Sequence, residues 1–66
     1  MTTSKDSTRF SVEIEVGNAA FDGEVEMSRE IARILRNLAD DVECGHISQT
    51  LRDVNGNRVG RASLDN

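Results

Sequence analysis

The sequence predicts a small α+β domain in which one helix packs on a three-stranded, largely antiparallel sheet in the order β-α-β-β. Three observations support this prediction: an alternating segment near the start, a long helical pattern in the middle and a hairpin signal near the end. The chain has 66 residues and no proline, which leaves room for one hydrophobic core. We expect residues 1–8 to form a disordered tail and residues 9–64 to form the single domain.

The first expected element is a strand over residues 10–16. Its apolar side chains alternate strictly with polar ones, and the apolar set is Phe10, Val12, Ile14 and Val16. A period of two is typical of a strand with one buried face. Because Glu13 and Glu15 occupy the opposite side, we expect both carboxylates to lie in solvent.

A loop is expected between this strand and the next element. Gly17–Asn18 ends the alternating pattern, and a hairpin that folded Ala19–Phe21 back on the strand would set Glu13 opposite Asp22. Like charges directly across an antiparallel pair are unfavourable, so a loop that leads into a helix is preferred. We expect Phe21 to act as an apolar plug.

The second expected element is a helix that starts after Asp22 or Ser28, either of which is a suitable N-cap. Its apolar residues fall at helical spacing on one stripe: Met27, Ile31, Ile34, Leu35, Leu38 and Val42. Gly45 is the expected stop after the helix. Arg36 and Asp40 have the spacing of an i,i+4 ion pair.

The last turn of this helix is strongly acidic. Asp40, Asp41 and Glu43 lie where the helix dipole prefers cations, and each acid there costs about 0.3–1 kcal/mol. A local rule broken in this way is a place to suspect a functional constraint, and drift on a solvated face is the alternative.

The third expected element is a hairpin with strands in residues 46–53 and 58–64. Either Asn55–Gly56 forms a two-residue type I′ turn, or Asp53–Gly56 forms a type I turn whose last glycine is left-handed. We prefer the second turn.

The preferred turn fixes the register of the hairpin. It sets Leu51 opposite Val59, whereas the other turn sets Leu51 against Gly60. In the preferred turn, the Asp53 side chain is expected to cap backbone N–H groups, which is a structural role.

The predicted core is thin. Its members are Phe10, Val12, Ile14, Phe21, Ile31, Leu35, Leu38, Val42, Leu51 and Val59. A three-stranded sheet with one covered face leaves its edges and its other face open. Homodimerisation through an edge or through the open face is therefore a candidate second source of stability.

The negative charge of the chain is concentrated in its middle. The net charge is −4, and residues 10–43 hold nine acids against three bases. An acidic body repels phosphate backbones and attracts basic surfaces, so we expect a protein partner and no direct contact with nucleic acid. The candidate partner-binding residues are these acids: Glu13, Glu15, Asp22, Glu24, Glu26, Glu30, Asp40, Asp41 and Glu43. The alternative is that the charge only keeps the domain soluble.

We expect no enzyme activity, no cofactor and no metal. Cys44 and His46 lack a third group to orient the imidazole, and two ligands are too few for a structural zinc site. The stretch Asp53–Asn57 lacks the glycine and glutamate positions of an EF-hand. No apolar run is long enough to cross a bilayer, and the single cysteine indicates a reducing cytoplasm.

Three stretches together resemble a family of very short proteins encoded by bacteriophages and mobile elements. The stretches are Gly17–Phe21, Ala32–Asp40 and Leu51–Gly60. The resemblance implies kinship in fold. It also implies a candidate activity, because the family includes anti-CRISPR inhibitors of type I effector complexes, and it brings no catalytic residue.

Two functions follow from the charge and the resemblance. In the first, the acidic surface imitates the phosphates of DNA, occupies the basic channel of a Cas effector subunit and blocks DNA binding. In the second, the chain is a small phage structural or adaptor protein that homodimerises through its sheet and has no inhibitory role. The helix arginines Arg29, Arg33 and Arg36 interrupt the negative field and count against mimicry.

Overall fold

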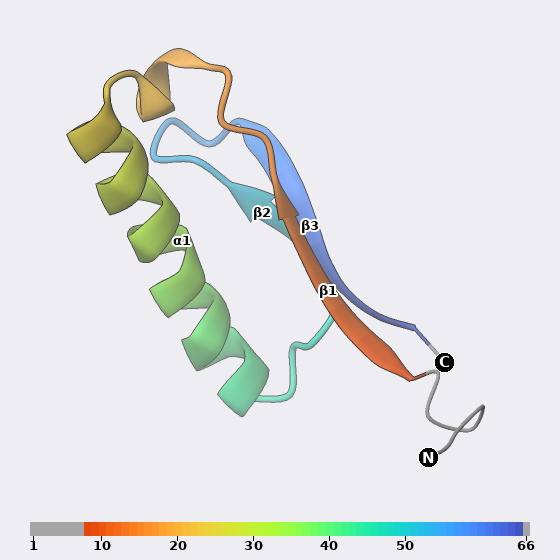
Figure 1. The fold of residues 1–66 in the computed structure, drawn as a ribbon. Helices are drawn as coiled ribbons and strands as arrows, with labels where there is room; N and C mark the ends of the chain where they lie inside the picture. Colours follow the sequence, from red (N-terminus) through yellow and green to blue (C-terminus); the bar gives the residue numbers. More distant parts are fainter. Residues whose placement is uncertain (1–7, 66) are drawn as a thin grey trace.

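The computed structural model describes residues 8–65, which form one helix beside a three-stranded antiparallel sheet (Figure 1). The elements along the chain are β1 (Arg9–Ile14), the 3-10 turn η2 (Ala19–Phe21), α1 (Glu24–Glu43), β2 (Gln49–Arg52) and β3 (Arg58–Asp65). β3 lies in the middle of the sheet, antiparallel to β1 and β2. The predicted fold class and element order are confirmed. Of the disordered tail expected at residues 1–8, residues 1–7 lie outside the described residues.

β1 forms where the sequence predicts a strand, but the burial of its side chains does not alternate, because Phe10 and Val12 are exposed. The strand ends at Ile14, earlier than expected, although the amide of Glu15 still donates to the carbonyl of Val59 at 2.7 Å. Val16 packs against the core beyond the end of the strand. The apolar side of β1 therefore faces the side of the sheet on which α1 lies.

The predicted loop before the helix is confirmed, but its predicted N-cap is wrong. Asn18 accepts a hydrogen bond from the amide of Ala20 at 2.8 Å and starts η2, which buries Phe21. α1 begins after Gly23, which provides no side-chain cap. Asp22 lies one residue before the N-cap position and ends η2, where its amide donates to Ala19 at 3.2 Å, and Ser28 lies inside α1.

The predicted stop of the helix is confirmed. Gly45 has a φ of 98°, its amide donates to Val42 at 3.0 Å, and the amide of His46 donates to Asp41 at 2.8 Å. These two bonds form the Schellman arrangement, which satisfies carbonyl groups that the helix itself leaves free. The chain then turns back along the sheet into β2.

The hairpin uses the preferred turn but not the preferred register. The amide of Gly56 donates to the carbonyl of Asp53 at 3.0 Å, and Gly56 has a φ of 84°, which glycine adopts without strain. Leu51 pairs with Gly60 rather than with Val59, so the expected Leu51–Val59 pairing is wrong. A bulge between Leu51 and Arg52 is the reason, because it lets Leu51 and Val59 both enter the core.

The core lies between α1, η2 and the hairpin. Its buried apolar members are Phe21, Ile34, Leu38, Leu51, Val59 and Ala62. Three further predicted core residues, Ile14, Ile31 and Val42, are half-buried and pack against it. The helix makes its main contacts with η2 and β2, so the core is centred away from β1.

The predicted burial of Phe10, Val12 and Leu35 is wrong. Their side chains are 44%, 36% and 43% exposed, respectively. The sheet order explains this, because β1 lies at the opposite edge from β2, where α1 docks. Ile34 and Ala62 are buried in the core instead.

The Asp53 carboxylate joins the hairpin turn to the loop after β1. One oxygen accepts the amides of Asn55 and Asn57 at 2.9 and 2.8 Å, which confirms the expected capping role. The other accepts the side-chain amides of Asn18 and Asn57 at 2.9 and 3.2 Å. Burial raises the pKa of Asp53, but the hydrogen bonds outweigh it and leave the pKa below its ordinary value.

The close approach of β1 to β3 at Gly60 gives a first prediction. A Cβ at this position would overlap the carbonyl oxygen of Glu13 and lie 2.8 Å from its carbonyl carbon. Gly60→Ala should therefore lower the free energy of unfolding by about 1–3 kcal/mol in urea denaturation. Gly17→Ala is the matched control, because nothing lies within 4 Å of its Cβ position, and it should change stability little. Equal stabilities for the two variants would contradict the close approach.

Acid unfolding tests the Asp53 network. The folded-state pKa of Asp53 is lowered, so its stabilisation is present above the ordinary carboxyl pKa of about 4 and is lost as pH falls through the lower folded value. Asp53→Asn should lower Tm at neutral pH by several degrees, because an amide NH₂ would meet the donors of Asn18 and Asn57. It should also flatten the fall of Tm below pH 4.

The control for this experiment is Asp22→Asn, because the exposed Asp22 carboxylate accepts no hydrogen bond from residues 8–65. Asp22→Asn removes one carboxylate but none of the Asp53 hydrogen bonds, so it should lower Tm at neutral pH by less than Asp53→Asn does. A profile for Asp53→Asn that is parallel to wild type throughout would show that Asp53 does not couple folding to pH.

Candidate protein-binding surface

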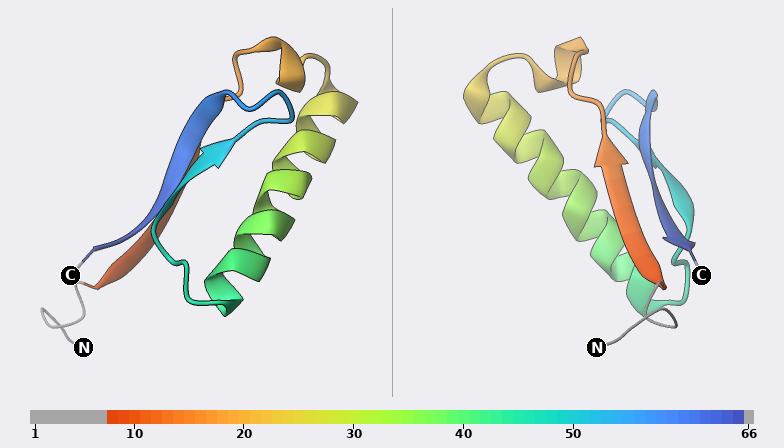
Figure 2. Two further views of the ribbon diagram at one scale, coloured as in Figure 1. Left: turned by 180° about the vertical axis from the view of Figure 1, so that it is seen from behind. Right: turned by 45° about the vertical axis from the view of Figure 1, so that its right-hand side comes forward.

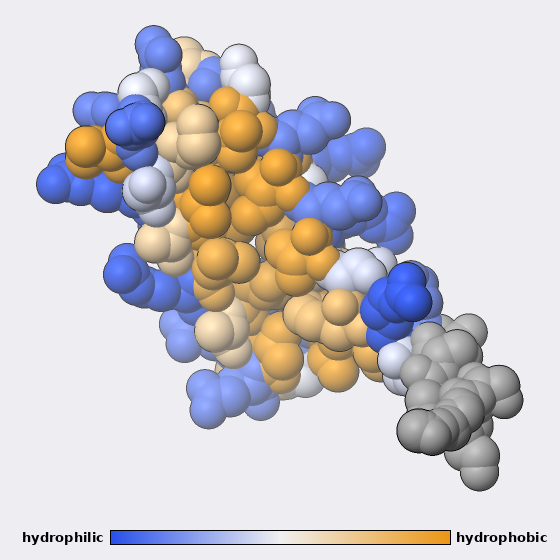
Figure 3. Space-filling model, viewed as in Figure 1, coloured by the Kyte–Doolittle hydropathy of each residue, from blue (hydrophilic) through white to orange (hydrophobic). Residues whose placement is uncertain are grey.

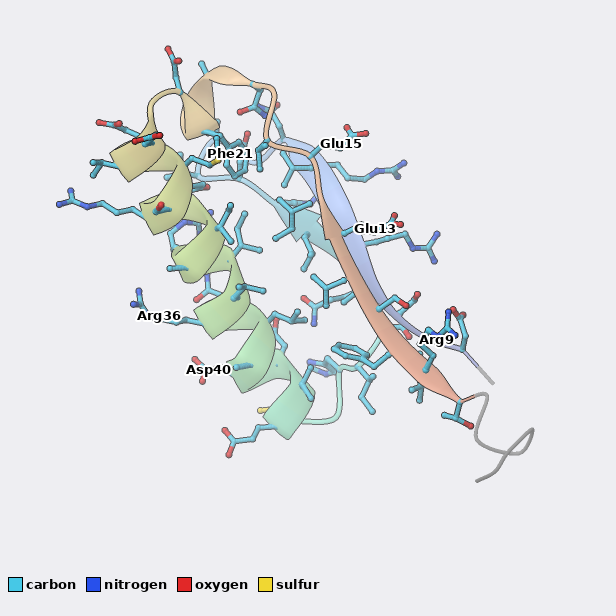
Figure 4. All side chains as sticks on the ribbon, in the orientation of Figure 1. Arg9, Glu13, Glu15, Phe21, Arg36 and Asp40 are labelled. Carbon is cyan, nitrogen blue, oxygen red and sulfur yellow. The ribbon has the colours of Figure 1, made fainter. Side chains whose placement is uncertain are left out.

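The outer face of the sheet, which points away from α1, carries two of the predicted site residues. Figure 4 shows Glu13 and Glu15 pointing away from the helix. A broad hollow on this face is lined by these acids together with Arg58 and Arg61 of β3. Glu13 lies opposite Arg61 in the register, and Arg9 lies opposite Asp65. The face therefore has mixed charge rather than a row of negative charges.

The start of α1 holds a second group of predicted site residues. Asp22, Glu24 and Glu26 are all exposed there. Negative charge is favourable at this end of a helix, because the unpaired N–H groups carry a partial positive charge. These three acids are consistent with a purely local role in helix stability.

The end of α1 holds the third group, which we call the acidic end: Asp40, Asp41 and Glu43. The last turn contains no basic residue, so the three carboxylates add to the partial negative charge of the helix end. Asp40 and Glu43 are exposed and Asp41 is half-buried. Figure 4 shows Asp40 and Arg36 on the side of α1 away from the sheet. The expected Arg36–Asp40 ion pair is not formed, since the one ion pair in residues 8–65 joins Arg33 and Glu30.

Glu30 differs from the other predicted site residues, because its carboxylate is used inside the fold. It accepts hydrogen bonds from the Nε and a terminal nitrogen of Arg33 at 3.0 and 2.7 Å, and from the amide of Val54 at 2.8 Å. The Arg33 hydrogen bond holds the pKa of Glu30 below its ordinary value against the opposing effect of burial. Glu30 therefore attaches α1 to the hairpin turn and is buried rather than part of an exposed acidic group.

The three exposed groups are far apart. Glu26 and Asp40 are 14 residues apart in α1, so its two acidic groups are separated by about 21 Å along the helix axis. Glu13 and Glu15 lie on the opposite side of the sheet from α1 (Figure 4). The structure brings the acids together only within each group.

Two residues after the acidic end, Cys44 and His46, are the candidates for nucleophilic and metal chemistry. Cys44 is an exposed free thiol at the C-cap of α1, and His46 is exposed just beyond it. No cluster of three or more His, Cys, Asp or Glu side chains suited to a metal ion occurs between residues 8 and 65. The Cys44 and His46 pair offers no third ligand from the described chain.

An exposed apolar surface lies beside β1, and the sequence pattern does not predict it. We call it the apolar strip, and its residues are Phe10, Val12, Leu35 and Leu64. Phe10 and Val12 share a sheet face with Leu64, which pairs with Phe10 across β1 and β3. Figure 3 shows apolar side chains continuing across the space between α1 and β1. Alternation could identify the apolar residues but not the edge of the sheet that the helix leaves uncovered.

No protein-family model, curated protein or solved structure matches the chain. In the described part of the chain, no helix combines the length and the apolar character that crossing a bilayer requires. The resemblance to short phage proteins stays a prediction.

Proposed function

We propose that the chain is a non-enzymatic inhibitor that binds a basic protein surface through the acidic end of α1. The observation that supports this is the group Asp40, Asp41 and Glu43, which lies at the negative end of the helix dipole without a basic residue in the last turn. Each such acid costs about 0.3–1 kcal/mol in the free chain. A basic partner would turn this cost into attraction and would speed the encounter.

The partner that fits this charge is a protein that binds nucleic acid in a basic channel. The resemblance to short phage proteins narrows it to a Cas subunit of a type I effector complex in the cytoplasm of a bacterial host. On this proposal the acidic end occupies the position of DNA phosphates and blocks DNA binding. Asp22, Glu24 and Glu26 at the start of α1, and Glu13 and Glu15 on the sheet, are secondary contacts because they lie elsewhere on the surface.

A second candidate function is a small structural or adaptor protein that associates with itself through its sheet. The apolar strip favours it, because exposed apolar residues that are contiguous mark interaction surfaces. Phe10 and Val12 lie on an edge strand, where backbone groups are also open to pairing. This function needs no acidic residue.

Replacing the acidic end separates the two functions. The variant Asp40→Ala, Asp41→Ala, Glu43→Ala should lose inhibition of DNA binding by a purified type I effector complex in a gel-shift assay. Its stability should be unchanged or raised by about 1 kcal/mol, because unfavourable helix-end charge is removed. Inhibition by wild type should weaken steeply as salt rises.

The matched control is the triple variant Asp22→Ala, Glu24→Ala, Glu26→Ala at the other end of the same helix. It removes equal charge and should retain most of the inhibition. Inhibition by the acidic-end variant at the wild-type level would contradict the proposed contact. Failure of wild type to inhibit would contradict the proposed partner.

The second candidate predicts self-association that depends on the apolar strip. Leu35→Glu should weaken self-association at least tenfold in sedimentation equilibrium, which corresponds to about 1.4 kcal/mol, because a carboxylate would lose its hydration at the contact. Val25→Glu makes the same change at another exposed apolar position of α1 and should have no effect. Association through the strip should persist in high salt, and loss of it in high salt would contradict this function.

A further inference from the structure

The outer edge of β1 carries backbone groups that no strand within residues 8–65 pairs with. β1 lies at one side of the sheet, and the amide of Glu15 donates to Val59 of β3 at 2.7 Å. Backbone groups alternate in direction along an antiparallel strand, so those of Phe10, Val12 and Ile14 point away from β3. β1 is the strand nearest the viewer in Figure 1, and Figure 2 shows no described segment along its outer side.

The opposite edge of the sheet is shorter and partly covered. β2 has four residues, and a terminal nitrogen of Arg33 from α1 donates to the carbonyl of Arg52 at 3.3 Å. β1 has six residues and lies beside the apolar strip. An open strand edge next to apolar residues is a template for pairing with another strand, and β1 is therefore the edge that needs a partner.

We infer that β1 pairs in antiparallel orientation with β1 of a second copy of this chain, centred on Ser11. This inference rests on the second candidate function and names its partner. In this register Phe10 lies opposite Val12 of the second copy, and their outward backbone groups form the hydrogen bonds. Arg9 lies opposite Glu13 of the second copy, and two-fold symmetry forms this pair twice.

Charge on the outer face selects this register. Within one chain Arg9 lies opposite Asp65 and Glu13 lies opposite Arg61. Pairing centred on Ser11 extends these into a row of alternating sign across four strands, from Asp65 and Arg9 to Glu13 and Arg61 of the second copy. Pairing centred on Glu13 would instead set two glutamates opposite each other. Exposed ion pairs are worth only about 0–1 kcal/mol each, so they specify the register more than they add strength.

Apolar burial supplies the strength. The two-fold axis keeps the helices of both copies on the same face of a continuous six-stranded sheet. Phe10 and Val12 of each copy then meet at the centre of that face, and Leu35 approaches from each helix. The strip that one helix leaves uncovered is thus covered by an identical strip, which removes two open edges at once.

A cysteine on the two-fold axis tests both the partner and the register. Ser11→Cys in a Cys44→Ser background should form an intermolecular disulfide under mild oxidation, since directly opposed residues of this type have Cα atoms about 4.5 Å apart. Ser63→Cys in the same background is the matched control, because Ser63 lies opposite Ser11 on the same face of the central strand. Its distance to the second copy's equivalent is about 14 Å, so it should not cross-link.

Sedimentation equilibrium of the wild-type chain at about 0.1 mM should give a dimer. A monomer there, together with no cross-link from Ser11→Cys, overturns the inference. A dimer in which Ser11→Cys cross-links no faster than Ser63→Cys overturns the register. Self-association that Leu35→Glu weakens, without the Ser11 cross-link, leaves the adaptor function standing and rejects the β1 pairing. A cross-linked dimer that Leu35→Glu leaves intact supports the pairing and rejects burial of the strip.

Discussion

The fold depends on polar ties that attach the helix and the first loop to the hairpin turn. Asp53 holds the turn and the Asn18 side chain, and Glu30 reaches from α1 to the amide of Val54 next to it. Arg33 extends the same attachment to the carbonyl of Arg52. Apolar contacts in a small core tolerate a shift of the helix along the sheet. Buried carboxylates do not, because a shift would break their hydrogen bonds. The ties therefore fix α1 at the β2 side of the sheet.

This placement determines which surfaces remain available. A single helix held at β2 cannot also cover β1 at the far edge, so Phe10 and Val12 stay exposed although they alternate like core residues. The same ties pair Glu30 with Arg33 and so remove one acid from the exposed surface. The carboxylates at the end of α1 lie beyond the reach of these ties and form no ion pair within residues 8–65.

Local patterns in the sequence were sufficient for the elements but not for their contacts. Alternation, helical spacing and the Asp53–Gly56 turn each depend on neighbouring residues, and all three predict the observed elements. The bulge beside Leu51 and the exposure of Leu35 depend on how the elements pack together, and local periodicity in the sequence does not predict that packing. The role of Glu30 could not be predicted from the sequence either, because the amide of Val54 that donates to it is 24 residues away.

The two proposed surfaces are compatible, and together they change what the acidic end can do. Asp40 points away from the sheet, so pairing along β1 leaves the acidic ends of both copies open (Figure 4). A dimer then offers two identical acidic groups related by a two-fold axis. A partner that presents two basic patches at matching spacing gains up to about 10²–10⁴-fold in avidity, whereas a partner with one patch gains nothing. Dimerisation would in this way select repeated basic surfaces over isolated ones, which a monomer with the same charge cannot do.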